Sequence, residues 1–188
     1  PLDFRGESYN FTRLQPFFNP GPLEQPKIPI SLGAVGPKMT ALAGEVADRL
    51  ITHPTNSAPR YLRETILPRL PKGAARAGRE LQDGELMIAP PIATGVDEAA
   101  VNVERENQRE LLAFLYSTPS YWPSLELFGW EERGAQLRSL TRENKWAKMK
   151  DVVDDEMLDA FVPSASYAQI AEELKRWYGE LATRITFP

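Results

Sequence analysis

The amino-acid sequence predicts an α/β fold in which about four parallel strands are covered by helices. Short apolar segments alternate with longer stretches whose apolar residues recur at helical spacing. Such alternation implies parallel pairing and right-handed crossovers. Hydrophobic residues make up 42% of the 188 residues and charged residues 26%, a balance that supports a packed core.

The first half of the chain begins with an arm, residues 1–27, that carries five prolines and five aromatic residues. This composition excludes a long helix or a central strand, so we expect an extended arm. Its aromatic side chains either anchor the arm to the body or line a pocket, and we expect anchoring. The elements that follow are expected at about 27–32 (strand), 37–47 (helix), 49–52 (strand), 58–70 (helix) and 72–84 (loop).

The second half is expected to add a third and a fourth strand. Asp97 is a typical helix-start residue, and Ser166 with Gln169 has the spacing of a capping box. The expected elements are 85–89 (strand), 97–117 (helix), several short helices within 118–160, a last helix that ends at Gly179, and 184–187 (strand). The predicted organisation is therefore an arm, 1–27, and a four-unit βα domain, 28–188, with a helical insertion at 118–160.

Composition excludes several classes of function. The net charge is −4 and no basic stripe is evident, which argues against a nucleic-acid partner. The chain has no cysteine and one histidine, so no metal site is expected. The apolar runs are shorter than the ~20 residues that a membrane span requires. Without an evident export leader, we expect a cytoplasmic protein with no membrane partner.

Residues 30–39 combine a short apolar strand, a turn with Gly33 and Gly36, and a helix that opens with Pro37. Glycines allow a ligand to approach the backbone closely, and proline is accepted in a first helical turn. The N–H groups of Lys38 and Met39 would then point out of the helix N-terminus, where anions such as phosphate bind. The alternative is an ordinary strand-to-helix turn.

The only histidine, His53, directly follows the second expected strand. Ligands of parallel α/β folds bind at the carboxyl ends of the strands, so His53 is expected near the mouth of the sheet. There it would contact a ligand or exchange protons near neutral pH. The alternative is a histidine at the surface or behind the site. No nucleophile motif surrounds Ser117.

A series of short motifs resembles the luciferase-like flavin and deazaflavin oxidoreductases, most of all the branch that uses coenzyme F420. The similarity begins near residue 16 and extends almost to the end of the chain. It is carried in order by Gly33-Ala34-x-Gly36-Pro37, Ala43-Gly44-Glu45-x-Ala47-Asp48, Tyr61-Leu62, Pro68, Gly73, Ala77-Gly78-Arg79, Phe114, Tyr116-Ser117-Thr118-Pro119-x-Tyr121, Gly129-Trp130, Asp154-Asp155, Tyr178-Gly179, Arg184 and Ile185.

The resemblance implies a fold and a partner. Members of that family are (β/α)8 barrels, which need about 250 residues. The matching part is the C-terminal half, so we expect half of a TIM barrel: a fragment, a processed product or a naturally split barrel. A half-barrel has two open strand edges. We therefore expect a homo-oligomer, or association with a missing N-terminal half-barrel.

The resemblance also implies a cofactor, which is coenzyme F420, with FMN as the alternative. The residues expected to bind it are Gly33, Ala34, Val35, Gly36, Pro37 and Lys38, whose turn holds the phosphate in the family, together with His53. The implied activity is hydride transfer to or from a small organic substrate. The family's catalytic groups come largely from the first half of the barrel, so no catalytic residue is assigned. The alternative function is a non-catalytic, self-associating half-barrel.

Overall fold

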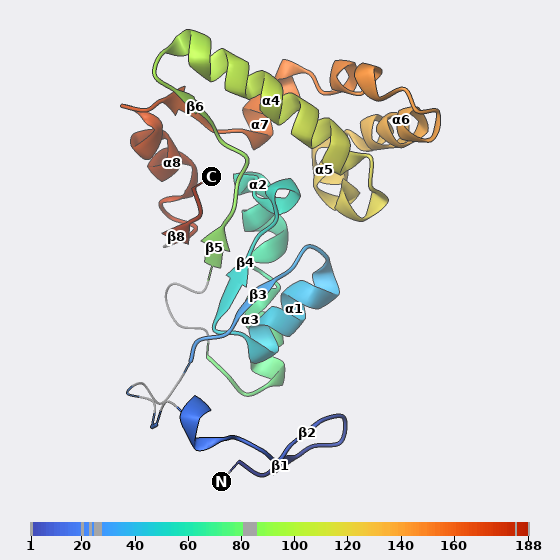
Figure 1. Ribbon diagram of the computed structural model, residues 1–188. Coiled ribbons are helices and arrows are strands. Elements are labelled where there is room, and N and C mark those ends of the chain that lie inside the picture. Colours follow the sequence, from blue (N-terminus) through green and yellow to red (C-terminus); the bar gives the residue numbers. More distant parts are fainter. Residues whose placement is uncertain are drawn as a thin grey trace.

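A four-stranded parallel sheet lies at the centre of the molecule (Figure 1). The structure, a computed structural model, describes residues 2–19, 21–22, 24, 28–80, 86–182 and 184–187. The strands are β3 (Ser31–Gly33), β4 (Arg49–Ile51), β5 (Leu86–Ile88) and β8 (Arg184–Ile185), in the order β3-β4-β5-β8. The predicted α/β fold with four parallel strands is confirmed. The expected strand positions 27 and 85 lie outside the described residues.

The register of the sheet brings the carboxyl ends of β3 and β4 side by side. Leu32 pairs with Leu50, and Leu50 pairs with Leu86, so three leucines cross the sheet in one row. Leu50, in the middle of that row, is almost completely buried. Pro29 precedes β3, where its missing N–H removes no bond from the ladder.

Two helices on one side of β3 and β4 touch through their backbones. They are α1 (Pro37–Val46) and α3 (Leu70–Arg76). A Cβ placed on Gly73 would lie 1.9 Å from the carbonyl oxygen of Ala41. One on Gly44 would lie 2.2 Å from the carbonyl oxygen of Leu70. The two glycines therefore set how closely the helices approach.

The helix expected over 58–70 is broken into parts. It begins as α2 (Pro59–Tyr61), continues as a π-helical segment, η3 (Leu62–Ile66), and passes through a turn into α3. The loop expected from residue 72 is thus wrong for residues 72–76. Pro71 lies in the first turn of α3, where proline is accepted. A new helix therefore begins at Leu70, between Pro68 and Pro71. Part of the expected loop, residues 81–84, lies outside the described residues.

A helical region follows β5, and its core continues that of the sheet. Its helices are α4 (Glu98–Tyr116), α5 (Trp122–Phe128), α6 (Glu131–Arg142) and α7 (Asp155–Phe161), with 3₁₀ turns at Pro119–Tyr121, Trp146–Lys148 and Lys150–Val152. Asp97 caps α4 as predicted, since its carboxylate accepts from the amide of Ala100 at 2.8 Å. The fully buried Leu112, Leu125 and Phe161 belong to the same core as Leu50 and Ile88.

A second parallel pair of strands was not predicted. β6 (Ala93–Gly95) pairs with β7 (Ser164–Ser166) at the two ends of the helical region. Ser166 therefore lies in a strand, and the predicted capping box is wrong. Gln169 instead precedes α8 (Ile170–Tyr178), and its side-chain oxygen accepts from the hydroxyl of Ser166 at 2.9 Å. α8 ends at Gly179, as expected.

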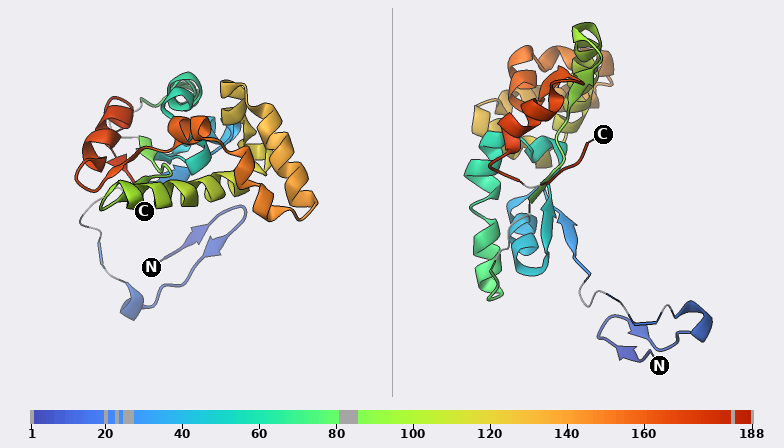
Figure 2. Two further views of the ribbon diagram at one scale, coloured as in Figure 1. Left: turned by 90° about the horizontal axis from the view of Figure 1, so that it is seen from above. Right: turned by 90° about the vertical axis from the view of Figure 1, so that its left-hand side faces the viewer.

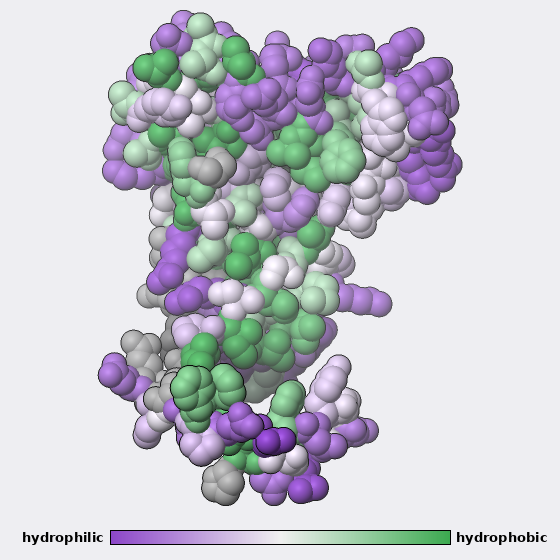
Figure 3. All heavy atoms as spheres, in the orientation of Figure 1, coloured by the Kyte–Doolittle hydropathy of each residue, from purple (hydrophilic) through white to green (hydrophobic). Residues whose placement is uncertain are grey.

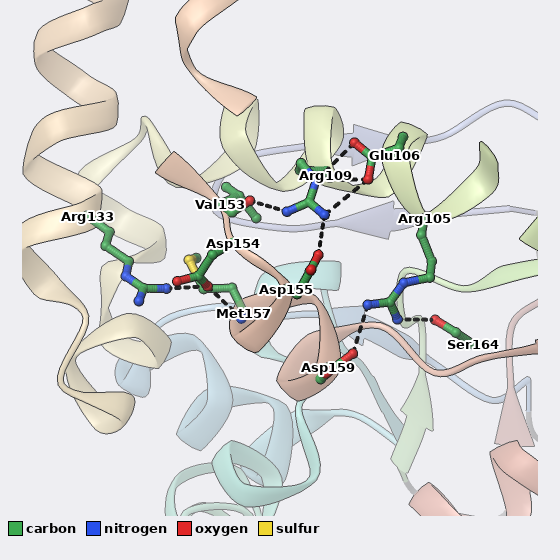
Figure 4. A network of polar contacts seen from close by, with 10 residues as sticks. All are labelled: Arg105, Glu106, Arg109, Arg133, Val153, Asp154, Asp155, Met157, Asp159 and Ser164. Carbon is green, nitrogen blue, oxygen red and sulfur yellow. Dashed lines mark hydrogen bonds and ion pairs between the residues drawn. The ribbon is translucent and has the colours of Figure 1, made fainter. Parts of the chain in front are cut away.

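An ionic network joins α4 to the segment that leads into α7 (Figure 4). Arg109, mostly buried, donates to Glu106, to Asp155 at 2.5 Å and to the carbonyl oxygen of Val153. The other two arginines of the network pair as Arg105 with Asp159 (2.8 Å) and Arg133 with Asp154 (2.7 Å). These contacts fix α7 against α4 and α6.

The N-terminal arm forms a small hairpin and stands off from the other elements (Figure 2). Its strands are β1 (Phe4–Arg5) and β2 (Asn10–Phe11), followed by a 3₁₀ turn at Pro16–Phe18. The aromatic side chains are 55–89% exposed and pair with each other, Phe4 with Phe11 and Phe17 with Phe18. The expectation that they anchor the arm to the body is therefore wrong.

Candidate functional site

The first residue of the turn after β3 still pairs with β4, and the chain then leaves the sheet. The amide of Ala34 donates to the carbonyl oxygen of Ile51 at 3.2 Å, and Ala34 itself is buried. Its own carbonyl oxygen accepts from the side-chain amide of Asn56 at 2.9 Å. Ala34 is thus fixed on both sides, and the chain turns at Val35 and Gly36, which are partly exposed.

α1 begins without a capping side chain from the described part of the chain. Gly36 is the N-cap residue and Pro37 follows in the first turn. Both the amide and the hydroxyl of Thr40 donate to the carbonyl oxygen of Gly36, each at 3.0 Å. The N–H groups of Lys38 and Met39 are left as the donors that point out of the helix, at the positive end of its dipole. The arrangement is suited to an anion.

The two glycines of the turn leave open space. A Cβ on Gly33 or on Gly36 would meet no atom within 4 Å. The backbone of Gly36 (φ −84°, ψ 165°) is extended, a conformation that residues with side chains adopt freely. Glycine is therefore not required there for its conformational freedom. What matters is the missing side chain, because it leaves room for a phosphate group beside the backbone.

The end of β4 is linked to the end of β5 by hydrogen bonds between buried hydroxyl groups. The amide of Ala89 donates to the hydroxyl oxygen of Thr52 at 3.0 Å, and Thr52 lies 2.7 Å from the hydroxyl of Ser57. Ser57 in turn donates to the carbonyl oxygen of His53 (2.8 Å) or of Ala89 (3.1 Å). Thr52 and Ser57 are buried. These hydrogen bonds fix the position of the His53 backbone.

Asn56 links the two strand ends. It closes η2 (Pro54–Asn56), where its side-chain oxygen accepts from the amide of His53 at 2.6 Å. Its side-chain nitrogen is the donor to Ala34, and only 2% of the residue is exposed. From the opposite side, the hydroxyl of Tyr116 donates to the carbonyl oxygen of Thr55 at 3.2 Å. The sequence analysis assigned no role to Asn56.

The ring of His53 is half-buried and held on two sides. It stacks on Tyr121 with ring centroids 4.7 Å apart and an interplanar angle of 16°. Its Nδ1 lies 2.9 Å from the hydroxyl of Thr55. Burial lowers the pKa of His53 below its usual 6.5, so the imidazole is neutral at pH 7. The structure therefore places His53 beside the turn at residues 33–38, through Asn56.

Other candidate positions have structural roles. The Asp154 carboxylate accepts from the amide of Met157 at 3.0 Å and so caps the start of α7. Among the described residues, no group of three or more His, Cys, Asp and Glu side chains is arranged to hold a metal ion. Within the same part of the chain, no helix is long and apolar enough to cross a membrane.

Comparison with known proteins gives a match along nearly the whole chain. The model of a family described as luciferase-like monooxygenase matches residues 1–184. An uncharacterized protein of Mycobacterium tuberculosis is 37% identical over 174 residues, which are 93% of this chain and 51% of the relative.

Two solved structures share the fold. The coenzyme F420-dependent tetrahydromethanopterin reductase from Methanopyrus kandleri superposes with a TM-score of 0.66 at 25% identity, over 84% of this chain and 44% of that chain. An F420-dependent secondary alcohol dehydrogenase superposes with a TM-score of 0.60 at 18% identity, over 98% of this chain and 49% of that chain. The chain thus spans about half the length of the proteins that it matches.

Proposed function

Because the chain belongs to the luciferase-like monooxygenase family, we propose that it forms part of an oxidoreductase that uses coenzyme F420. The protein containing it passes a hydride between that cofactor and a small organic substrate. The cofactor supplies the hydride chemistry, and the protein supplies binding and orientation. FMN is the alternative cofactor, because it offers a phosphate to the same turn.

The observation that carries the proposal is the open turn at the carboxyl end of β3. The backbone of Gly33, Ala34, Val35, Gly36, Pro37 and Lys38 would hold the phosphate, with His53 beside it. The outward-pointing N–H groups at the start of α1 and the space beside the two glycines suit an anionic group. The reductase from Methanopyrus kandleri, an F420-dependent enzyme by its name, supports F420 over FMN.

The test is a titration of the purified protein with F420 and, separately, with FMN, followed by fluorescence. We expect Gly36→Val to weaken binding tenfold or more, which corresponds to about 1.4 kcal/mol. The valine side chain would occupy the space that the phosphate needs.

The same variant provides its own control. The backbone angles of Gly36 suit valine and its Cβ would meet no atom within 4 Å, so the unfolding free energy of the variant in urea should stay within about 0.5 kcal/mol of the parent. Unchanged cofactor affinity in a stable Gly36→Val protein would overturn the phosphate assignment.

A second candidate function is a non-catalytic half-barrel that associates with itself. It is favoured by an exposed apolar surface formed by residues just before the edge strand β3 and by α1, which we name the β3–α1 face. Its members are Ile28, Ile30, Met39, Leu42 and Val46, each 38–67% exposed. A partner that covers this face is either a second copy of the chain or a further half-barrel that pairs with β3.

A further inference from the structure

We infer that His53 is held as its neutral Nε2–H tautomer and donates a hydrogen bond to a phosphate oxygen of the ligand at the Gly33–Lys38 turn. The ligand part of this inference rests on the proposed function. The tautomer and protonation of the His53 ring do not depend on the proposed function, because they follow from contacts within the chain.

The tautomer follows from the direction of one hydrogen bond. The backbone N–H of Thr55 points at Nδ1 of His53 at 3.4 Å, and a backbone amide can only donate. Nδ1 must therefore accept, and the hydroxyl of Thr55, 2.9 Å from the same atom, acts as a second donor. A neutral imidazole carries one ring proton, so that proton lies on Nε2.

The cationic form is disfavoured by the same contacts. Protonating Nδ1 would bring its N–H against the amide of Thr55. Burial of the ring acts in the same direction and lowers the pKa of His53. The side chain is thus a neutral donor at pH 7, with a role unlike that of a general base.

The ring is oriented, and one of its edges is available. Stacking on Tyr121 fixes the plane of the imidazole, and Thr55 holds the Nδ1 edge. Nε2 is separated from Nδ1 by Cε1, and no hydrogen bond within the described parts of the chain uses it. A donor that is fixed in direction and left without an acceptor is suited to a ligand oxygen.

His53 lies next to the turn because of the strand register. Gly33 pairs with Ile51, and the amide of Ala34 still bonds to the carbonyl oxygen of Ile51. His53 follows Ile51 by two residues, just beyond the end of β4. Asn56 then bridges the carbonyl oxygen of Ala34 and the amide of His53. The backbone of His53 is therefore held next to the turn that leads into α1.

The ring state is measured directly by NMR. The chain has a single histidine, so a long-range ¹H–¹⁵N spectrum of uniformly labelled protein at pH 7 contains one pair of ring nitrogens. We expect the pattern of the Nε2–H tautomer. An Nδ1–H pattern, or the averaged pattern of interconverting tautomers, would overturn the inference.

The donor role is tested by two substitutions with opposite properties. His53→Phe keeps an aromatic ring for Tyr121 and removes the donor. His53→Gln removes the ring and keeps an amide N–H near the same place. With FMN as the probe, we expect binding to weaken at least tenfold for His53→Phe and less than threefold for His53→Gln. If stacking alone mattered, the order would be reversed.

Riboflavin, which lacks the phosphate, identifies the acceptor. We expect His53→Phe and the parent protein to bind riboflavin equally, and a loss as large as that with FMN would overturn the phosphate assignment for His53. If the parent binds FMN and His53→Phe binds it equally well, the inference fails while the proposed function stands. If the parent binds neither FMN nor F420, the proposed function and the donor role both fail.

Discussion

Asn56 joins two strand ends through a single side chain. Its carboxamide donates to Ala34 and accepts from His53, so it uses both of its functions within the fold. Because the residue is buried, water cannot replace either bond when the side chain changes. The shape of the turn at 33–38 and the position of His53 therefore depend on one residue that contacts neither solvent nor the proposed ligand.

We expect Asn56→Ala to lower the unfolding free energy by about 2 kcal/mol, since it leaves two buried backbone groups without partners. Asn56→Asp should cost more at pH 7, because a carboxylate placed against the carbonyl oxygen of Ala34 cannot donate. Urea denaturation measures both. The exposed Asn107→Ala is the control and should stay within about 0.5 kcal/mol of the parent. A larger effect of Asn107→Ala would contradict the argument.

Asp154 provides a prediction about pH. Burial alone would raise the pKa of this carboxyl, but the hydrogen bond from the amide of Met157 and the ion pair with Arg133 outweigh it and hold the pKa below 3.8. The carboxylate therefore contributes stability above about pH 3.9, its unfolded value, and loses it as the pH falls through the lower folded value.

We expect Asp154→Asn to be less stable than the parent at pH 7 by about 0.5 kcal/mol, the size of a half-exposed ion pair. Urea denaturation at pH 7, 5 and 3 should show this difference at the first two values and its decrease at the third. In 1 M NaCl the difference should also shrink, because salt screens the pair. A difference that is constant with pH would contradict the assignment.

At the level of residues, the sequence predicts those parts of the site that are formed by neighbouring residues of the chain. The turn at 33–38 and His53 could be found because glycine, proline and a lone histidine have recognisable positions next to apolar segments. Asn56 and Tyr121 could not be assigned. Their partners, Ala34 and His53, are far away in the sequence, and the contacts depend on the strand register and on where α4 lies.

The crossing of α1 and α3 shows how two elements depend on a missing side chain. Gly44 and Gly73 face backbone carbonyls of the opposite helix, which cannot rotate away as a flexible side chain could. The short distance brings α3 close to α1 and leaves Ala43 and Ala74 buried between neighbouring elements. Small residues at the crossing therefore replace the large side chains that fill most helix contacts.

We expect Gly73→Ala to destabilise the protein by about 3 kcal/mol, because its methyl group would overlap the carbonyl oxygen of Ala41 and push α3 away. In an uncrowded helix the same change would be stabilising. Thermal and urea unfolding measure the effect. Gly33→Ala, where no atom lies within 4 Å, is the matched control and should be close to neutral. Equal stability of the two variants would contradict the close crossing.

At the level of elements, the prediction succeeded where the periodicity was strong and the ends carried signals. α1 and α4 carry clear start signals, which are Pro37 in the first turn of α1 and Asp97 as the N-cap of α4. It failed for β6 and β7, whose three residues each are too few and too small to show an alternating pattern. It also failed at α3, where a loop was expected from residue 72 although Pro71 lies in the first turn of a helix.

The whole molecule presents an apolar surface at one edge of its sheet. β3 is an edge strand of the order β3-β4-β5-β8, and the β3–α1 face is apolar and exposed. In Figure 3, hydrophobic residues gather in the region that β3 and α1 occupy in Figure 1. An open parallel strand next to exposed apolar side chains favours pairing with another chain.

We expect the parent chain to associate in solution and Val46→Lys to weaken that association, because a charge would be placed within the β3–α1 face. Sedimentation over a range of concentrations measures the change. Val103→Lys, at an exposed position of α4, is the control and should leave the association unchanged. A parent chain that stays monomeric at high concentration would contradict self-association and leave a further half-barrel as the expected partner.

The fold class of the whole could be predicted, because it depends on alternation along the chain. The half-barrel expectation agrees with matches that span 44–51% of longer relatives. The position of the arm could not be predicted in the same way. Aromatic residues indicate that some surface will be contacted, but they do not specify which one. Here Phe4 contacts Phe11, and Phe17 contacts Phe18.

The pairing of β6 with β7 has a consequence for how the chain folds. Ala93 meets Ser164 only after about seventy residues of helices and turns have been ordered between them. Closing so long a loop is entropically unfavourable until the intervening helices have made it compact. The contacts among α1, β4 and α3 join segments that are close in the sequence, so they can form without closing a long loop. We therefore expect the chain to assemble from its first βα units, with the two long-range strand pairs, β6–β7 and then β5–β8, closing last.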